Sequence, residues 1–147
     1  MKGTKGTTNM AIDFSNIRLE VVDLNINATP DIYINQSAIT FSKRVLEDLA
    51  YPQYVQYCMD ASQKIFAIRS CKGTETKATI FAKPKAEQSN TLSFTNKNLR
   101  DVITALIPEY DSKQRYKVTG EFDAENRVMY FDMATATVAN FFHKTAE

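Results

Sequence analysis

Alternation of apolar and polar residues along the chain predicts a series of short β-strands, because successive side chains of a strand point to opposite faces. Two of these predicted strands flank the turn DASQK at residues 60–64, which is short enough to make them a hairpin. A second pair flanks the turn DAENR at residues 123–127. The predicted strands cover residues 17–26, 31–35, 38–41, 54–60, 64–71, 78–81, 91–94, 115–123 and 127–133.

Helical spacing replaces this alternation in two places. After Ser42, the apolar residues of KRVLEDL (43–49) share one helix face, and Pro52 limits this helix to about two turns. Ser42 is the predicted cap, because its hydroxyl is suited to accept a hydrogen bond from an unpaired amide of the first turn. Thr95 has the same place before a second predicted helix. A further short helix is predicted in residues 135–147.

The two predicted helices lie in similar stretches, ITFSKRVLEDL at residues 39–49 and LSFTNKNLRDV at residues 92–102. Matching residues are 53 positions apart in these stretches and 63 positions apart in the turns that follow. Because the whole order of strand, capped helix, strand, acidic turn and strand recurs, we predict an internal duplication with units at about residues 31–73 and 88–134. The alternative is that any small α+β domain offers two stretches of this kind.

One such unit buries too little apolar surface to fold alone, so the two units are expected to complete one core. The predicted fold class is therefore α+β, with internally duplicated strand–short helix–hairpin units forming a curved sheet or a swapped-hairpin-like barrel. Residues 1–10 are predicted to be a flexible leader and residues 11–147 a single domain. Such a chain is expected to be a monomer that acts as a pseudo-dimer, or a homodimer.

The composition agrees with a folded domain, because 44% hydrophobic and 11% aromatic residues among 147 are enough to fill a core. No apolar run approaches the roughly 18 residues that a membrane span needs. The polar start MKGTKGTTNM shows no secretory signal, so we expect a cytoplasmic protein without a membrane partner. Cys58 and Cys71 fit that compartment and are predicted to be structural, with a disulfide or a reactive thiol as the alternative.

Residue patterns typical of catalysis are scarce. The chain has no Gly-rich phosphate loop, no H-E-x-x-H and no nucleophile elbow, and His143 is its only histidine. Glu47 and Asp48 are neighbours in sequence and do not share a helix face cleanly. The cysteine spacing matches no zinc pattern. We therefore expect neither an enzyme nor a bound cofactor.

The net charge of +1 conceals a basic stretch between two acidic flanks. Residues 64–100 contain eight basic residues and two acidic ones. This stretch also carries aromatic residues and predicted strands, and a β-ribbon can enter the major groove of DNA. The sequence thus indicates duplex DNA as one partner. The alternative is that these are ordinary solvated charges, which the near-neutral net charge favours.

Tyrosines indicate a protein partner as the second hypothesis. The chain has seven tyrosines and no tryptophan, and Tyr51, Tyr54 and Tyr57 cluster just after the first predicted helix. At strand spacing Tyr51 and Tyr57 share one face and Tyr54 takes the other. Tyrosine is enriched at interfaces because it combines a large apolar area with a polar tip, although such residues also commonly cap a core.

The repeated unit resembles the AbrB-type (SpoVT/MazE-like) swapped-hairpin family. The first copy offers AITFSKRVLEDL, YVQYCMD and KIFAIRSCK, and the second offers TLSFTNKNLRDV, YKVTGEFD and RVMYFDM. The chain departs from the family pattern at Leu49-Ala50, where the family has Leu-Gly, and at Tyr51-Pro52, where it has Gly-Asp.

This resemblance implies a barrel of interleaved hairpins and a non-enzymatic regulator that contacts DNA through basic residues on one face. The residues we expect to make these contacts are Lys43, Arg44, Lys64, Arg69, Lys72 and Lys97. Lysines would hold phosphates, and Arg44 or Arg69 would reach a base edge. Antitoxin members of the family bind a toxin as well, so a protein-binding accessory, antitoxin-like or inhibitor protein of a mobile element is the alternative function.

Overall fold

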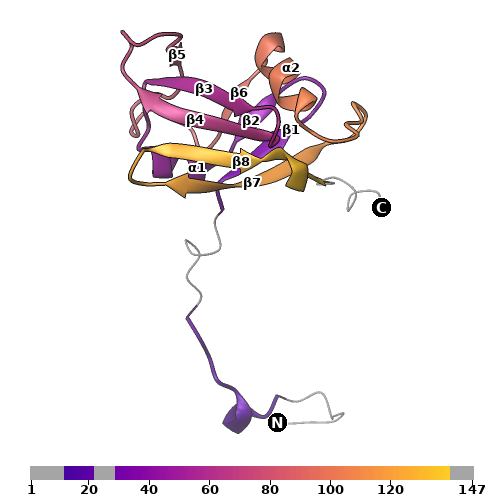
Figure 1. The fold of residues 1–147 in the computed structure, drawn as a ribbon. Helices are drawn as coiled ribbons and strands as arrows, with labels where there is room; N and C mark the ends of the chain where they lie inside the picture. Colours follow the sequence, from indigo (N-terminus) through magenta and orange to yellow (C-terminus); the bar gives the residue numbers. More distant parts are fainter. Residues whose placement is uncertain (1–11, 22–28, 140–147) are drawn as a thin grey trace.

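The strands form one antiparallel sheet that curls into a half-barrel (Figure 1). The computed structural model describes residues 12–21 and 29–139. Its elements are η2 (Phe14–Asn16), β1 (Asp31–Ile34), β2 (Ile39–Phe41), α1 (Lys43–Leu49), β3 (Tyr54–Asp60), β4 (Ile65–Cys71), β5 (Thr79–Ile80), β6 (Leu92–Phe94), α2 (Lys97–Ala105), β7 (Tyr116–Asp123), β8 (Val128–Asp132), η3 (Met133–Thr135) and β9 (Thr137–Val138). The strands follow the order β5-β3-β4-β8-β7-β1-β2-β6, and β9 pairs with β7. The structure thus confirms a mixed α and β fold with a strongly curved sheet.

The first predicted strand is wrong in the part that the structure describes. Residues 17–21 adopt no regular structure, and the side chains of Leu19 and Val21 are 92% and 99% exposed. An alternating pattern becomes a strand only where a neighbouring strand takes up its backbone hydrogen bonds, and these residues have no such neighbour. The remainder of that prediction, residues 22–26, and the predicted leader, residues 1–10, lie outside the described residues.

The helix predicted near the C-terminus is also wrong where it is described. Residues Met133–Thr135 form a 3-10 turn, and Thr137–Val138 pairs with β7 as a short strand. The sheet offers free backbone groups on β7 at this point, so pairing satisfies the chain better than an isolated short helix would. Residues 140–147, which include His143, lie outside the described residues.

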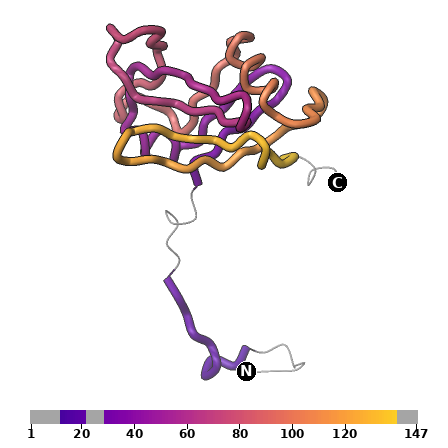
Figure 2. The backbone as a smooth tube through the Cα atoms, viewed as in Figure 1, coloured from indigo at the N-terminus to yellow at the C-terminus, as the bar shows by residue number. Residues whose placement is uncertain are grey.

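Both predicted hairpins are confirmed, and they lie side by side (Figure 2). Each hairpin turns at an aspartate whose carboxylate accepts hydrogen bonds from backbone amides of its own turn. Asp60 accepts from Ser62 at 3.0 Å, and Asp123 accepts from Asn126 at 3.2 Å. These short local bonds explain why an acidic residue opens both turns.

Strand pairs also join residues that are far apart in the sequence. β2 pairs with β6, in the register Ile39↔Phe94, Thr40↔Ser93 and Phe41↔Leu92. β4 pairs with β8 along five residues, and the middle pair is Ala67↔Tyr130. β1 pairs with β7. The sheet is therefore held together by contacts between the first and second halves of the chain.

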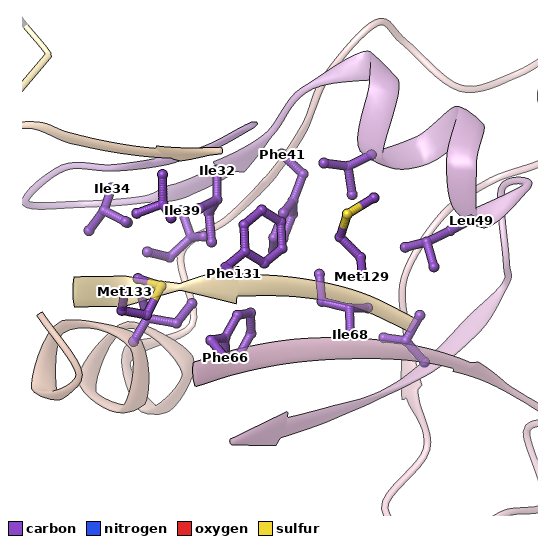
Figure 3. Packing of buried hydrophobic residues seen from close by; sticks show 14 of the residues in the cluster. Ile32, Ile34, Ile39, Phe41, Leu49, Phe66, Ile68, Met129, Phe131 and Met133 are labelled. Atoms are coloured by element: carbon purple, nitrogen blue, oxygen red, sulfur yellow. The ribbon is translucent and has the colours of Figure 1, made fainter. Parts of the chain in front are cut away.

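The core lies on the concave side of the sheet, and α1 closes one part of it. Val45, Leu46 and Leu49, the predicted apolar face of this helix, are fully buried. Figure 3 shows Leu49 directed from α1 toward β8, beside Met129. Helical spacing in the sequence therefore identified the face of α1 that packs on the core.

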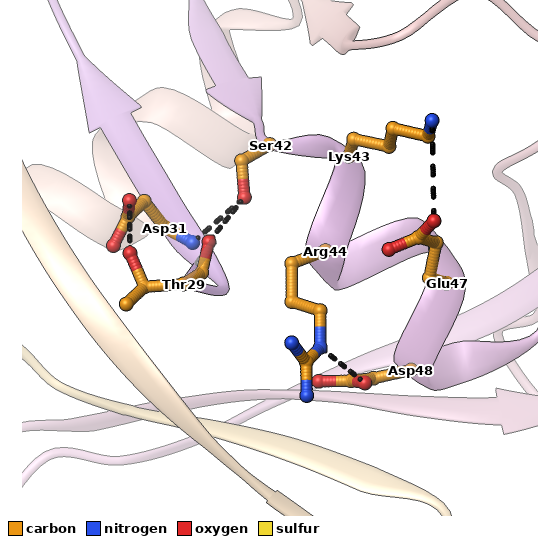
Figure 4. A network of polar contacts seen from close by, with 7 residues as sticks. All are labelled: Thr29, Asp31, Ser42, Lys43, Arg44, Glu47 and Asp48. Atoms are coloured by element: carbon orange, nitrogen blue, oxygen red, sulfur yellow. Dashed lines mark hydrogen bonds and ion pairs between the residues drawn. The ribbon is translucent and has the colours of Figure 1, made fainter. Parts of the chain in front are cut away.

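The predicted helix caps are wrong in detail. Ser42 occupies the N-cap position of α1, but its side chain bonds no amide of the helix. Its hydroxyl instead donates to the Thr29 carbonyl at 3.0 Å and accepts from the Asp31 amide at 2.9 Å, which ties the start of β1 to the helix (Figure 4). In α2 the cap is Asn96, one residue after Thr95, and its side chain accepts from the Leu99 amide at 3.1 Å. The Ser42 hydroxyl bonds the backbone beside β1 and not the helix, and the side-chain amide oxygen of Asn96 caps α2 in place of the Thr95 hydroxyl.

Candidate functional site

Three of the predicted DNA-binding residues, all on the helices, are already paired with carboxylates one turn away. Arg44 lies 2.9 Å from Asp48 and Lys43 lies 4.0 Å from Glu47 (Figure 4). The hydrogen bond that the Arg44 guanidinium donates to the Asp48 carboxylate raises the pKa of Arg44 further above its usual range.

On α2, Lys97 lies 2.7 Å from Asp101. The positive charges of these three predicted residues are therefore each offset by a neighbouring carboxylate. Exposed ion pairs of this kind are weak, so these basic side chains can still exchange their carboxylate partners for phosphates. While the pairs are formed, however, the helices do not present a concentrated positive potential.

Lys64 is separated from the other predicted residues of the hairpin. It lies in the turn between β3 and β4 with φ of 61°, and its carbonyl accepts a hydrogen bond from the Met133 amide at 2.8 Å. Lys72 follows the opposite end of β4. At about 3.3 Å per residue, the seven residues of this strand place the two lysines roughly 25 Å apart. Lys64 thus lies at the opposite end of the hairpin from Arg69 and Lys72.

Arg69 is held close to the loop that follows β4. Its Nε and Nη2 atoms both donate to Oε1 of Gln56, at 3.0 and 2.9 Å, and Nε2 of Gln56 donates to the Thr76 carbonyl at 2.7 Å. Lys72 and Lys77 bracket that loop and are exposed. We call Arg69, Lys72 and Lys77 the basic loop cluster.

The same loop has a single acidic side chain, and that side chain is engaged with the backbone. The carboxylate of Glu75 accepts a hydrogen bond from the Lys72 amide at 2.8 Å. Among residues 12–21 and 29–139, ion pairs within 4.0 Å occur only in the two helices, so no carboxylate pairs with a base of the cluster. Two predicted residues, Arg69 and Lys72, therefore lie in one basic loop with Lys77, and none of the three is ion-paired to a described carboxylate.

The outer face of the sheet beside this cluster is not basic. Along one row of paired residues, Gln56, Arg69, Val128 and Asp123 follow one another across four strands. Glu121, Tyr130 and Asp132 line a shallow hollow further along the same strands. Contact with a polyanion over the whole sheet face would bring these carboxylates against phosphates, which disfavours that arrangement.

The three predicted protein-binding tyrosines are half-buried and serve different purposes. Tyr51 is not in a strand, since it follows the end of α1 with φ of 52° and its amide donates to the Leu46 carbonyl. Tyr51 thus lies outside the strand on which the prediction placed it, although Tyr51 and Tyr57 both pack against the core and Tyr54 does not. Tyr54 lies under the basic loop, where its ring faces Gly73.

Tyr57 belongs mainly to the core. Its ring stacks on Phe66 with centroids 5.8 Å apart, and burial strongly raises the pKa of its hydroxyl. Among the described residues that hydroxyl has no hydrogen-bond partner and is shielded from solvent. A buried hydroxyl without a partner is costly, so Tyr57 is held there by its ring and is not displayed for a partner.

The two cysteines are free thiols on neighbouring strands. Cys58 lies opposite Ala67 and Cys71 lies opposite Tyr54, so three rows of the β3–β4 ladder lie between them. Partial burial, followed by the Glu75 carboxylate, raises the pKa of Cys71, which lowers its reactivity as a thiolate. The predicted structural role agrees with these positions.

One further feature was not anticipated from the sequence. A pocket of about 350 Å³ opens between α2, β6 and the β3–β4 hairpin. Its walls include Tyr57, Met59, Phe66, Phe94 and Leu99. The sequence shows each of these as an ordinary apolar position of a strand or helix, and no periodic pattern reveals that their packing leaves a hollow.

The sequence matches no protein-family model and no curated protein. In the part of the chain that the structure describes, no helix is long and apolar enough to cross a membrane. Within the same residues, no three His, Cys, Asp or Glu side chains gather where they could hold a metal ion.

Proposed function

We propose that this protein is a non-enzymatic DNA-binding regulator, built as a pseudo-dimer of two related units in one chain. The basic loop cluster of Arg69, Lys72 and Lys77 would contact the duplex. The observation that carries the proposal is the chain of hydrogen bonds from Arg69 through Gln56 to Thr76, because it ties Arg69 to the loop that carries Lys72 and Lys77. None of these three bases is ion-paired to a described carboxylate.

The register of the strands supports the internal duplication. In the β2–β6 pair, the central residues Thr40 and Ser93 are 53 positions apart, which is the offset between the two copies of this stretch. In the β4–β8 pair, the central residues Ala67 and Tyr130 are 63 positions apart, which is the offset of the hairpins. Antiparallel pairing centred on equivalent residues is what a two-fold relation between units produces.

The strand order supports the resemblance to swapped-hairpin proteins. β1, β2 and β4 of the first unit pair with β7, β6 and β8 of the second. The units are thus interleaved along the sheet, as the hairpins of two subunits are in that family's dimers. Neither unit retains a complete sheet without the other, which is the physical reason for carrying both.

The chemistry of the cluster suits a phosphate backbone. Two lysines and an arginine present positive charge on exposed side chains, and Lys–phosphate contacts release the counterions that surround DNA. Arg69 keeps its second terminal nitrogen, Nη1, outside the bonds to Gln56, so its guanidinium can still donate to a phosphate or a base edge. These contacts would position the protein, and sequence preference would come mainly from Arg69.

The proposal predicts a steep salt dependence. Binding to a mixed-sequence duplex of about 20 base pairs, followed by fluorescence anisotropy, should weaken as salt rises, with a slope near 0.9 for each phosphate contact. Lys72→Ala together with Lys77→Ala should lower that slope by roughly two. Lys64→Ala is the matched control, because Lys64 is equally exposed but lies at the other end of β4.

Two outcomes separate the parts of this proposal. Absence of binding even at low salt would remove DNA binding as the function. Binding whose slope is unchanged by the double substitution would leave the function standing and move the contact elsewhere. Arg44→Ala then tests the helix bases, since their ion pairs would have to open for DNA to be held there.

Binding to a protein partner remains a prediction of the sequence. Of the three predicted tyrosines, Tyr54 is the one that lies beside the basic loop cluster and outside the core. A protein partner that contacts Tyr54 would therefore cover the surface proposed to bind DNA.

A further inference from the structure

The pocket beside α2 is lined by side chains without a formal charge. Three aromatic rings, those of Tyr57, Phe66 and Phe94, form much of its wall. The remaining lining residues are Cys58, Met59, Thr79, Asn96, Asn98, Leu99 and Val102. Its volume of about 350 Å³ is at the small end of the range for ligand-binding pockets, which is roughly 300–1,000 Å³.

The equivalent place in the other half of the molecule is filled by the chain itself. Val45, Leu46 and Leu49 of α1 are fully buried and pack in the core beside β8. Moved by 53 positions, these residues correspond to Asn98, Leu99 and Val102 of α2, and all three line the pocket. A polar residue therefore replaces Val45, and a smaller one replaces Leu49. The hollow exists because α2 has too little apolar volume to fill the space that α1 fills.

Exposure shows that the apolar surface of the pocket reaches the solvent. The side chains of Met59 and Val102, on opposite walls, are 57% and 38% exposed. Apolar groups at the mouth of a hollow lose contact with water when a guest enters, which favours binding. Asn98, also exposed, makes no side-chain hydrogen bond among the described residues, so its amide is free to bond a polar group on the guest.

We propose that this pocket binds a small, uncharged aromatic molecule that carries one hydrogen-bonding group. The rings and the sulfur atoms of the walls suit an aromatic guest, which can pack against the half-buried Phe94 and touch Met59 through its edge. A charged guest is disfavoured, because no side chain of the lining could neutralise it. Since a cavity of about 150 Å³ is enough for benzene, the pocket has room for a substituted single ring or for two fused rings. This site does not depend on DNA binding.

Benzyl alcohol and benzoate are suitable probes, since they share a ring and differ in charge. Titration would be followed by NMR through the methyl groups of Met59, Leu99 and Val102. Benzyl alcohol should cause saturable shifts at these methyl groups, with a dissociation constant below about 1 mM for so small a ligand. Benzoate should bind at least tenfold more weakly.

Val102→Phe places a larger side chain in the pocket and should weaken the binding of benzyl alcohol at least tenfold. Val138→Phe is the matched control, because Val138 is similarly exposed, at 47%, but lies on β9 outside the lining. It should leave binding unchanged. If Val102→Phe perturbs the fold, Asn98→Phe replaces it, because Asn98 is exposed and lines the same pocket.

Several results would overturn the proposal. They are shifts that do not saturate, equal binding of benzoate and benzyl alcohol, and binding that persists in both pocket-filling variants. A last titration uses blocked phenylalanine, N-acetyl-phenylalanine amide, to test whether the pocket prefers a side chain of another protein. Binding more than tenfold tighter than that of benzyl alcohol would assign the pocket to a protein side chain and overturn its assignment to a free molecule.

Discussion

The same substitution at equivalent positions of the two helices should have very different costs. Leu46 of α1 and Leu99 of α2 are 53 positions apart and share the same place in the repeated pattern. Leu46 is fully buried in the core, whereas Leu99 is half-buried and borders the open pocket. Replacing each by alanine removes the same atoms from a packed and from a loosely packed environment.

The size of each effect follows from the cavity that is created. Leu46→Ala removes a buried side chain from among fully packed neighbours, so we expect a loss of about 3–5 kcal/mol in the free energy of unfolding. Leu99→Ala mainly enlarges a space that is already open, and only part of the side chain was shielded from water. Its expected loss is therefore about 1–2 kcal/mol. The larger value is a substantial part of the roughly 5–15 kcal/mol that stabilises a typical domain.

Urea unfolding would measure both losses. Far-UV circular dichroism is the suitable signal, because the chain has no tryptophan whose fluorescence could report unfolding. With a slope of about 2 kcal/mol per molar urea, the midpoint should fall by roughly 2 M for Leu46→Ala and by less than about 1 M for Leu99→Ala. Should Leu46→Ala fail to fold, Leu46→Met reports the same site with a smaller change. Equal losses at the two positions would refute the reasoning that α2 is underpacked.

Two further predictions concern close packing and the hairpin turns. A Cβ at Gly120 would lie 2.9 Å from the backbone oxygen of Tyr130, so Gly120→Ala should cost about 1–3 kcal/mol in urea unfolding. Gly73→Ala, which meets only a side-chain ring, should cost less, and a larger loss at Gly73 would contradict this. Hydrogen bonds within the turns lower the pKa of Asp60 and Asp123 from 3.8, so their contribution to stability is present at neutral pH and lost as the pH falls through the lowered values. The difference in urea midpoint between the protein and Asp60→Ala should therefore shrink below about pH 4, and a difference that is constant down to pH 2 would contradict it.

Local order was largely predictable because it depends on short-range patterns. The bounds of β3 and α1 follow from side-chain periodicity and from Pro52, and an aspartate opens each hairpin turn. The strand predicted over residues 17–26 failed in its described part, residues 17–21, because pairing requires a neighbour, which no local pattern can supply. Ser42 failed as a cap for a similar reason, since the backbone of β1 came close enough to take its hydroxyl.

The candidate site was less predictable, because it depends on which charges and hollows come together. Arg69 and Lys72 were predicted, but their association with Lys77 depends on Gln56, whose role appears only when the loop folds back over β3. Arg44 and Lys97 were predicted as contacts, and the structure places a carboxylate beside each of them. The pocket could not be predicted from the sequence, because it forms where the side chains of several separate elements fail to fill the space between them.

By itself, the sequence determined where the two hairpins and both α-helices form and that acidic turns join the hairpins, because neighbouring residues along the chain decide those features. The tertiary structure alone decided which half pairs with which, how completely each helix covers the sheet and which bases remain uncompensated. These depend on contacts between residues 50 to 90 positions apart, such as Thr40 with Ser93 and Asp31 with Thr119. Their energies arise only once the backbone has brought the two halves into register.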